Sequence, residues 1–294
     1  MQPKKTALIT DLDNTLFDWV ELWLNCFSPM LDEIAEISGI TKDRLIPEIR
    51  EVHRRHGTSE YSFLIEELPS IQRFLSGREA TKVFGTAIDI YRRQRRDYLR
   101  LFPTVGETLL TIKGAGTLII GYTESMSFYS NYRLRRLGLD GVLDHVFCPE
   151  DHLLPEGLSQ EDLRKYPSEH FKLNFTKQHF TPKGSKKPDT AVLNAIVSDL
   201  GLNKADCVYV GDNLMKDVAM ALDGGIEDAW AKYGQAHKRP EYKLLQDVTH
   251  WTLEEVEREQ KIKEREHVEP THTLDSSFSE ILPLFDFCEF KQAK

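Results

Sequence analysis

The 294-residue sequence predicts an α/β fold, a three-layer Rossmann-like core with a parallel sheet and an inserted all-helical domain. Two observations predict it. Short apolar runs alternate with helical patterns along the second part of the chain, as in parallel strands joined by helices. Residues 18–101 instead have a helical pattern broken only by prolines and glycines. We therefore expect residues 1–17 and 102–294 to form the core, with insertions at about 149–182 and 235–270, and residues 18–101 to form the helical domain.

The core elements follow from the apolar runs in chain order. Ala7 to Ile9 form a compact run that ends at Asp11, which predicts a buried strand that delivers an acid to a loop. Further strands are expected at residues 117–122, 146–148, 207–210 and 228–231, and helices over 104–113, 128–137, from about 189, and over 214–222. Thr123 and Asp212 directly follow two of these strands. Because ligands bind at the carboxyl ends of parallel strands, we expect Asp11, Thr123 and Asp212 to share one edge of the sheet.

The composition limits the classes of partner. The formal charge is -9, from 38 basic and 47 acidic residues, which argues against a broad nucleic-acid surface and favours a small-molecule ligand. Cys26, Cys148, Cys207 and Cys288 show no CxxC spacing, so we expect no zinc cluster, no disulfide framework and a cytoplasmic location. The apolar stretch near the N-terminus is too short for a signal segment or a membrane span, and we expect no membrane partner. The sequence does not indicate the oligomeric state.

The two insertions have different characters. Residues 149–182 are polar, rich in aromatic side chains and weakly periodic, which predicts a long loop beside the site that serves the substrate or an interface. Residues 235–270 include the charge-dense run LEEVEREQKIKEREH, which we interpret as a solvated surface helix.

Four acidic side chains suit the chemistry of a phosphate ester, which requires a nucleophile, a proton donor and countercharge. Asp11 and Asp13 are two residues apart after a strand, so one can attack while the other transfers a proton. Asp212 and Asp217 follow another apolar strand and offer carboxylates of the kind that Mg²⁺ requires. Taken alone, Asp11 and Asp13 would equally fit an Asx turn or a helix N-cap, and Asp217 would fit a helix first turn.

These motifs together carry a family resemblance. Four segments resemble, in order and spacing, the haloacid dehalogenase superfamily, specifically its phosphatase branch with a helical C1-type cap. They are DLDNTLFD, the strand that ends in Thr123, the KKP at 186–188 and GDNLMKD. The resemblance covers the core from Thr6 to about Ala231. It resumes at Thr273 to Phe285, which looks like the closing strand and helix of the family.

The resemblance implies a role for each acid. Asp11 would be the nucleophile that forms an aspartyl-phosphate, with one oxygen also on Mg²⁺. Asp13 would be the general acid and then the base, with its backbone carbonyl on the metal. Asp212 would complete the metal site. Asp217 would act on a metal-bound water or fix the catalytic lysine, and Thr15 would be a supporting residue.

The resemblance also implies a phosphate-binding set. Thr123 would hold a phosphate oxygen through its hydroxyl, while Glu124, which follows it, adds a negative charge at the same position. Lys187 would neutralise the nucleophile and the phosphoryl group, and Lys186 is the alternative because the preceding loop is irregular. Asn213 would be a further supporting residue.

The function that follows is Mg²⁺-dependent hydrolysis of a small phosphomonoester, such as a sugar phosphate, a phosphoglycolate-like acid or a nucleotide monophosphate. Asp13 favours this over the carbon–halogen branch of the family, because expulsion of a halide requires no proton donor. The alternatives are a carbon–halogen hydrolase and a non-catalytic binding protein on the same fold.

Residues 18–101 correspond, by the resemblance, to a mobile cap that closes over the site and selects the substrate. Arg55, His56 and Tyr61 lie around a predicted break between two helices and are able to meet an anionic substrate. A solvated helix end, where basic residues are favoured by the helix dipole, fits Arg55 and His56 slightly better.

Overall fold

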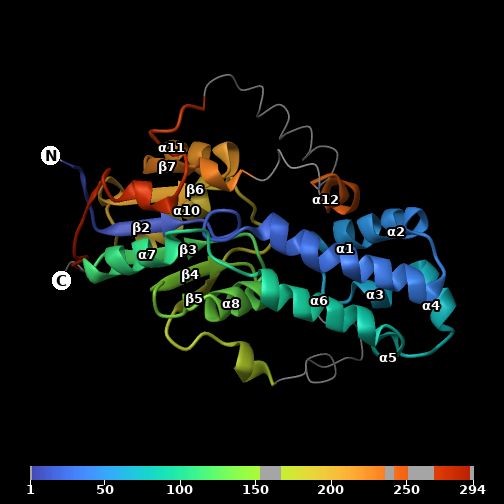
Figure 1. Ribbon diagram of the computed structural model, residues 1–294. Helices are drawn as coiled ribbons and strands as arrows, with labels where there is room; N and C mark the ends of the chain where they lie inside the picture. Colours follow the sequence, from blue (N-terminus) through green and yellow to red (C-terminus); the bar gives the residue numbers. More distant parts are fainter. Residues whose placement is uncertain (1, 153–166, 236–241, 251–267, 292–294) are drawn as a thin grey trace. The chain divides into compact units, whose positions relative to one another are not determined.

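The computed structural model describes residues 2–152, 167–235, 242–250 and 268–291, which form two compact units (Figure 1). The core unit comprises residues 2–18, 100–152, 167–235 and 268–291. The helical unit comprises residues 19–99 and 242–250. The chain therefore contributes two separate segments to the helical unit, one of which follows most of the core.

The core unit contains a seven-stranded sheet in the order β5-β4-β3-β2-β6-β7-β8, in which every neighbouring pair is parallel. This confirms the predicted α/β fold. The strands are β2 (Ala7–Thr10), β3 (Leu118–Tyr122), β4 (His145–Cys148), β5 (Lys177–Phe180), β6 (Cys207–Gly211), β7 (Glu227–Ala231) and β8 (His272–Leu274). A separate parallel pair joins β1 (Lys4–Lys5) to β9 (Asp286–Phe287).

Strand β2 lies at the centre of the sheet, between β3 and β6. Its four residues are all buried, which explains why its sequence is apolar without alternation. Ile9 is opposite Ile120 of β3 on one side and Tyr209 of β6 on the other. This register makes the three central strands end at the same level.

Helices cover both faces of the sheet. The described residues of the core unit form the helices α7 (Val105–Gly114), α8 (Ser127–Arg136), α10 (Thr190–Asp199) and α11 (Ala219–Asp223), with short helical turns at η1 (Ser168–Phe171), η2 (Lys204–Asp206), η3 (Leu214–Val218), η4 (Lys232–Gly234) and η5 (Phe278–Ile281). Ile196 of α10 and Met220 of α11 pack in one cluster with Ile9. The connections through α10 and α11 lead toward β8, whereas those through α7 and α8 lead toward β5. Because the crossovers are right-handed, α7 and α8 therefore cover the face opposite to that of α10 and α11 (Figure 1).

The segment expected as a long loop at 149–182 contains β5, one of the two edge strands of the sheet. β5 pairs in parallel with β4, from Lys177 opposite His145 to Phe180 opposite Cys148. An edge strand has one strand neighbour and its side chains here are exposed or half-buried, so it needs no apolar run and gives a weak sequence signal. Residues 153–166 lie outside the described part of the chain.

The helical unit contains α1 (Trp19–Ser38), α2 (Lys42–His56), α3 (Leu64–Glu67), α4 (Pro69–Leu75), α5 (Ala80–Val83), α6 (Gly85–Tyr98) and α12 (Tyr242–Val248). α1 packs along α6, and α12 packs on α2. Arg50 Nε donates to the carbonyl of Asp247 at 2.6 Å, and His53 Nδ1 donates to that of Val248 at 2.7 Å. The part of the 235–270 insertion that the structure describes around α12 thus belongs to the helical unit and not to the core, where the whole insertion was expected.

The helix expected from LEEVEREQKIKEREH falls outside the described residues. Among the helices that are described, none is long and apolar enough to cross a membrane.

Candidate active site

The carboxyl ends of the three central strands each deliver a residue of the candidate site. Asp11 follows β2, Thr123 follows β3 and Asp212 follows β6. The Asp11 N–H donates to the carbonyl of Val210 at 2.8 Å, which continues the strand pairing up to the acid itself. The structure thus places these three residues at one edge of the sheet.

The loop after β2 is shaped by its own backbone. Asn14 has a φ of 60°, a left-handed conformation that asparagine and glycine tolerate best. Its N–H donates to the carbonyl of Phe17 at 2.8 Å, and the N–H of Leu16 donates to that of Leu12 at 2.9 Å. The buried hydroxyl of Thr15 lies 3.4 Å from Asp11 Oδ2. The loop therefore turns back on itself and keeps Thr15 beside Asp11.

A buried lysine links two of the acids. Lys187 Nζ lies 2.5 Å from Asp11 Oδ1 and 3.0 Å from Asp217 Oδ1. Burial alone would lower the pKa of Lys187, but Asp11 and Asp217 outweigh it and hold this pKa well above its ordinary value. Lys186, the alternative, is exposed. Of the two candidate lysines, Lys187 is therefore the one whose ammonium group contacts Asp11.

Asp217 is fully engaged by protein donors. Besides Lys187, its Oδ1 accepts a hydrogen bond from the Tyr209 hydroxyl at 2.9 Å, and its Oδ2 accepts one from the Asn213 N–H at 3.1 Å. The side chain packs so closely on Gly211 that a Cβ there would lie 2.3 Å from Asp217 Cγ. Asp217 is 2% exposed, so it is not a surface acid at the start of a helix. Its contacts fit a residue that fixes the lysine.

Asn213 caps the helical turn that follows β6. Its side-chain oxygen accepts hydrogen bonds from the N–H groups of Met215 and Lys216 at 2.9 and 3.0 Å. The turn, η3, is a π-helix that leads directly into the α-helix α11. The single helix expected over 214–222 is thus a π-helical segment followed by an α-helical one. In this structure Asn213 supports the site through the backbone that positions Asp217.

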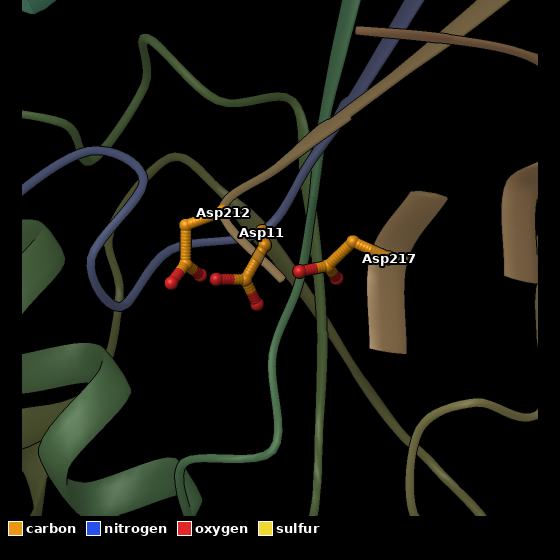
Figure 2. A group of neighbouring side chains, drawn as sticks. All are labelled: Asp11, Asp212 and Asp217. Atoms are coloured by element: carbon orange, nitrogen blue, oxygen red, sulfur yellow. The ribbon is translucent and has the colours of Figure 1, made fainter. Parts of the chain in front are cut away.

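Asp11, Asp212 and Asp217 form a carboxylate cluster in which one oxygen of each lies within 4.8 Å of the others (Figure 2). Burial, together with the charges of Asp217 and Asp13, raises the pKa of Asp11 to about 8, although Lys187 acts in the opposite direction. Burial and the charges of Asp217 and Asp11 also raise the pKa of Asp212 well above its ordinary value. The cluster thus has a deficit of positive charge.

These donors suit a hard divalent cation. All are carboxylate oxygens, the ligand type that Mg²⁺ prefers. Asp11 and Asp212 are the better candidates, because the oxygens of Asp217 already accept three hydrogen bonds. A bound cation would relieve the electrostatic cost that the raised pKa values express.

Asp13 has a separate environment from Asp11. Its Oδ2 accepts hydrogen bonds from the hydroxyls of Thr123 at 3.1 Å and Ser125 at 2.7 Å, and its Oδ1 accepts one from Arg133 at 3.0 Å. Thr123 Oγ1 also accepts a hydrogen bond from the Ser125 N–H at 3.0 Å. The threonine expected to bind phosphate is therefore in contact with the second acid.

The negative charge of Glu124 is balanced within the protein. Its Oε2 accepts a hydrogen bond from Lys216 Nζ at 2.8 Å, and its Oε1 accepts one from the Lys187 N–H at 3.1 Å. Burial alone would raise the pKa of Glu124, but Lys216 in particular lowers it below its ordinary value. This carboxylate therefore ties the loop of Lys187 to η3, and it offers no donor to a phosphate.

Sequence reasoning missed several residues of the site. Ser125 lies two residues after Thr123, so its place in the sequence could have indicated that it lies near the site. Arg133 is one of three arginines in α8 and resembles a surface residue in sequence. Tyr209 is part of an apolar strand, and nothing in its neighbours indicates that its hydroxyl meets Asp217.

The three residues proposed for substrate selection lie within the helical unit and share one acid. Arg55 Nη1 and His56 Nε2 donate to Glu67 Oε2 at 3.0 and 2.9 Å, and the Tyr61 hydroxyl donates to Glu67 Oε1. The His56 and Tyr61 rings are stacked with centroids 3.6 Å apart. The structure brings these three residues together around Glu67, and their role toward a substrate stays a prediction.

Two family models match the chain. The model of haloacid dehalogenase-like hydrolases matches residues 5–225, and a model described as HAD-hydrolase-like matches residues 185–276. Together they include every residue of the carboxylate cluster and Lys187.

Two curated relatives are named glyceraldehyde 3-phosphate phosphatase. The protein from Methanopyrus kandleri is 21% identical over 224 residues, which cover 75% of this chain and 81% of that protein. The protein from Pyrococcus furiosus is 22% identical over 275 residues, which cover 89% and 94%.

Solved structures share the fold. A 2-haloacid dehalogenase from Pseudomonas syringae superposes with a TM-score of 0.55 at 19% identity, covering 95% of this chain and 97% of that one. The HAD-hydrolase YfnB from Bacillus subtilis, in a form bound to magnesium, has a TM-score of 0.50 at 14% identity, covering 96% and 99%. At these identities the likeness concerns the fold alone.

Proposed function

Since this chain belongs to the haloacid dehalogenase-like hydrolases, we propose that it hydrolyses a small phosphomonoester through a phosphoryl group transferred to Asp11. One observation carries the proposal. A buried lysine contacts the candidate nucleophile, while a second acid, Asp13, is held separately by Thr123, Ser125 and Arg133. Two acids in different environments can take different roles in one reaction.

The first step is attack by a carboxylate oxygen of Asp11 on phosphorus. The bond from phosphorus to the ester oxygen breaks, and Asp13 gives its proton to that oxygen, so the alcohol leaves as a neutral molecule. The product on the enzyme is an aspartyl-phosphate. Lys187 supports this step because its retained proton offsets charge on Asp11 and on the phosphoryl group.

The second step is hydrolysis of the acyl phosphate. Asp13, now ionised, takes a proton from water, and the resulting hydroxide attacks phosphorus. The phosphorus bond to Asp11 breaks, inorganic phosphate leaves, and both acids return to their starting states. Asp13 therefore acts as acid and then as base.

We assign Mg²⁺ as the cofactor. The carboxylates of Asp11 and Asp212 would hold it, with the backbone carbonyl of Asp13 as the resemblance implies. When bound, the ion supplies positive charge against the phosphoryl oxygens and polarises them. Support comes from the oxygen-only donor set and from the raised pKa values of both carboxyl groups.

The substrate we favour is a small sugar phosphate. The two curated relatives carry the name glyceraldehyde 3-phosphate phosphatase, and each aligns with three quarters or more of this chain. Glyceraldehyde 3-phosphate is therefore the first compound to assay, followed by phosphoglycolate and nucleoside monophosphates. The location we propose remains the cytoplasm.

The experiment is a phosphate-release assay over this panel with Mg²⁺, with EDTA and with Asp11→Asn. We expect turnover of at least one phosphomonoester that requires both Mg²⁺ and Asp11. Activity that survives EDTA or Asp11→Asn would contradict the mechanism. A parallel assay with 2-chloropropionate and halide detection tests the carbon–halogen alternative, for which we expect no release.

A further inference from the structure

Arg133 is a buried cation beside the candidate site. Its side chain, on α8, is 3% exposed, and its guanidinium lies over the rings of Phe17 and Tyr129, each centroid 5.6 Å away. Burial of a cation is costly unless hydrogen-bond acceptors or a charged partner compensate it. The partner is Asp13, whose Oδ1 lies 3.0 Å from Arg133 Nη1.

The same guanidinium nitrogen organises the other contacts of Asp13. Arg133 Nη1 also donates to Ser125 Oγ at 2.9 Å, and this hydroxyl in turn donates to Asp13 Oδ2 at 2.7 Å. The Ser130 hydroxyl, one turn before Arg133 on α8, donates to the carbonyl of Ser125 at 2.8 Å. Both oxygens of Asp13 are thus fixed by groups that α8 holds in place.

We propose that Arg133 is a positioning residue for Asp13, which it holds in the orientation that delivers a proton to the leaving oxygen. This inference rests on the proposed function. The Asp13 side chain is 20% exposed, so it is restrained by Arg133 and still accessible to a substrate. Proton transfer is sensitive to misplacement of the donor, and a buried cation packed against two rings limits that misplacement.

Direct phosphate binding explains the arrangement less well. A guanidinium that binds phosphate presents two free N–H groups toward it. Here Nη1 is shared between Asp13 and Ser125, and the aromatic rings of Phe17 and Tyr129 lie against the group. This arrangement favours action of Arg133 on Asp13 over direct contact with the substrate.

The dependence of rate on the leaving group separates these roles. An alkyl phosphate needs a proton on its departing oxygen, whereas 2,4-dinitrophenyl phosphate expels a stable anion without one. The ratio kcat/KM reports steps up to the departure of the alcohol, so it isolates the proton transfer from the later hydrolysis of the aspartyl-phosphate. A residue that positions the proton donor matters only for the alkyl ester.

The experiment compares kcat/KM for glycerol 3-phosphate, or the best alkyl ester of the panel, with that for 2,4-dinitrophenyl phosphate. For Arg133→Gln we expect a loss of about 10- to 100-fold with the alkyl ester and less than about threefold with the dinitrophenyl ester. Arg133→Lys, which keeps the charge, should restore part of the loss. Arg136→Gln, an exposed arginine on the same helix, is the matched control and should change neither.

Equal losses with the two esters would overturn the inference, because phosphate binding and a general loss of structure both affect the esters alike. If Arg133→Gln fails to fold, Ser125→Ala decides in its place, since it removes one donor from Asp13 with a small change in volume. The same preferential loss with the alkyl ester is then expected. A wild-type protein that turns over neither ester would instead refute the proposed function.

Discussion

Lys187 Nζ lies 2.5 Å from Asp11 Oδ1, and the two side chains are only 2% and 11% exposed. The pair is nevertheless not electrically balanced, because burial and neighbouring acids raise the pKa of Asp11 to about 8 despite the lysine. The site is thus suited to a further positive charge, and without one the buried carboxylates destabilise the protein.

Replacement of Asp11, the proposed nucleophile, should therefore have opposite effects on activity and stability. Asp11→Asn should reduce turnover by about 10³-fold or more. Because the folded pKa of Asp11 exceeds its unfolded value of 3.8, its contribution to stability is fully present below pH 3.8 and is lost as the pH rises to about 8. In EDTA, Asp11→Asn should raise the Tm relative to wild type, and more at pH 8 than at pH 5. Asp223→Asn, at an exposed site, is the control, and an equal gain at both pH values would contradict the argument.

Asp212 and Asp217 should differ in their effect on metal affinity. Asp217 has both oxygens engaged by Lys187, Tyr209 and Asn213, whereas no side chain of the described residues donates a hydrogen bond to the Asp212 carboxylate. Titration of the apoproteins with Mg²⁺ should show that Asp212→Asn weakens binding by about tenfold or more. Asp217→Asn should mainly lower kcat, because it releases Lys187. The reverse pattern would exchange the two roles.

The absence of a side chain at Gly211 is a requirement of the site. A Cβ there would lie 2.3 Å from Asp217 Cγ, and Asp217 has no space to retreat because it is buried. Gly211→Ala should displace Asp217 and reduce kcat by about 100-fold. Gly114→Ala is the matched control, since a Cβ at this helical position meets nothing within 4 Å, and its activity should equal that of wild type. Full activity of Gly211→Ala would show that the strand end can shift.

The sequence was sufficient to predict the parallel sheet and to place the acids at the ends of its strands. Asp11, Thr123 and Asp212 each follow an apolar run, and the parallel topology alone requires that such residues meet. Lys187 could be favoured over Lys186 only through the family motif, because an irregular loop gives no periodicity to place it.

Partners within the site were harder to predict, because they depend on tertiary contacts. Glu124 looked like an unfavourable charge beside a phosphate, but Lys216, which is 92 residues away in sequence, neutralises it. Arg133 is 120 residues from Asp13, and one buried arginine on a helix with two others has no distinguishing pattern. The edge strand β5 was missed for a related reason, since its polar sequence KQHF lacks the apolar run of a central strand.

The attachment of α12 to α2 was also not predictable from pattern, and it gives the helical unit an acid-sensitive contact. His53 is 1% exposed, its Nδ1 donates to the carbonyl of Val248 at 2.7 Å, and its Nε2 has no hydrogen-bond partner among the described residues. Burial lowers the pKa of His53 to about 4, although the bond to Val248 acts in the opposite direction and the charge of His56 adds to the lowering.

The stability contributed by neutral His53 should be present above the unfolded pKa of 6.5 and lost as the pH falls toward 4, because the unfolded chain takes up the proton first. The free energy of unfolding should fall by about 2 kcal/mol between pH 7 and pH 5 from this group. Urea titrations at both pH values measure it. His53→Gln should lower stability at pH 7 but remove most of this pH dependence, whereas the exposed His170→Gln should retain it. An unchanged pH dependence in His53→Gln would show that other groups control the acid sensitivity.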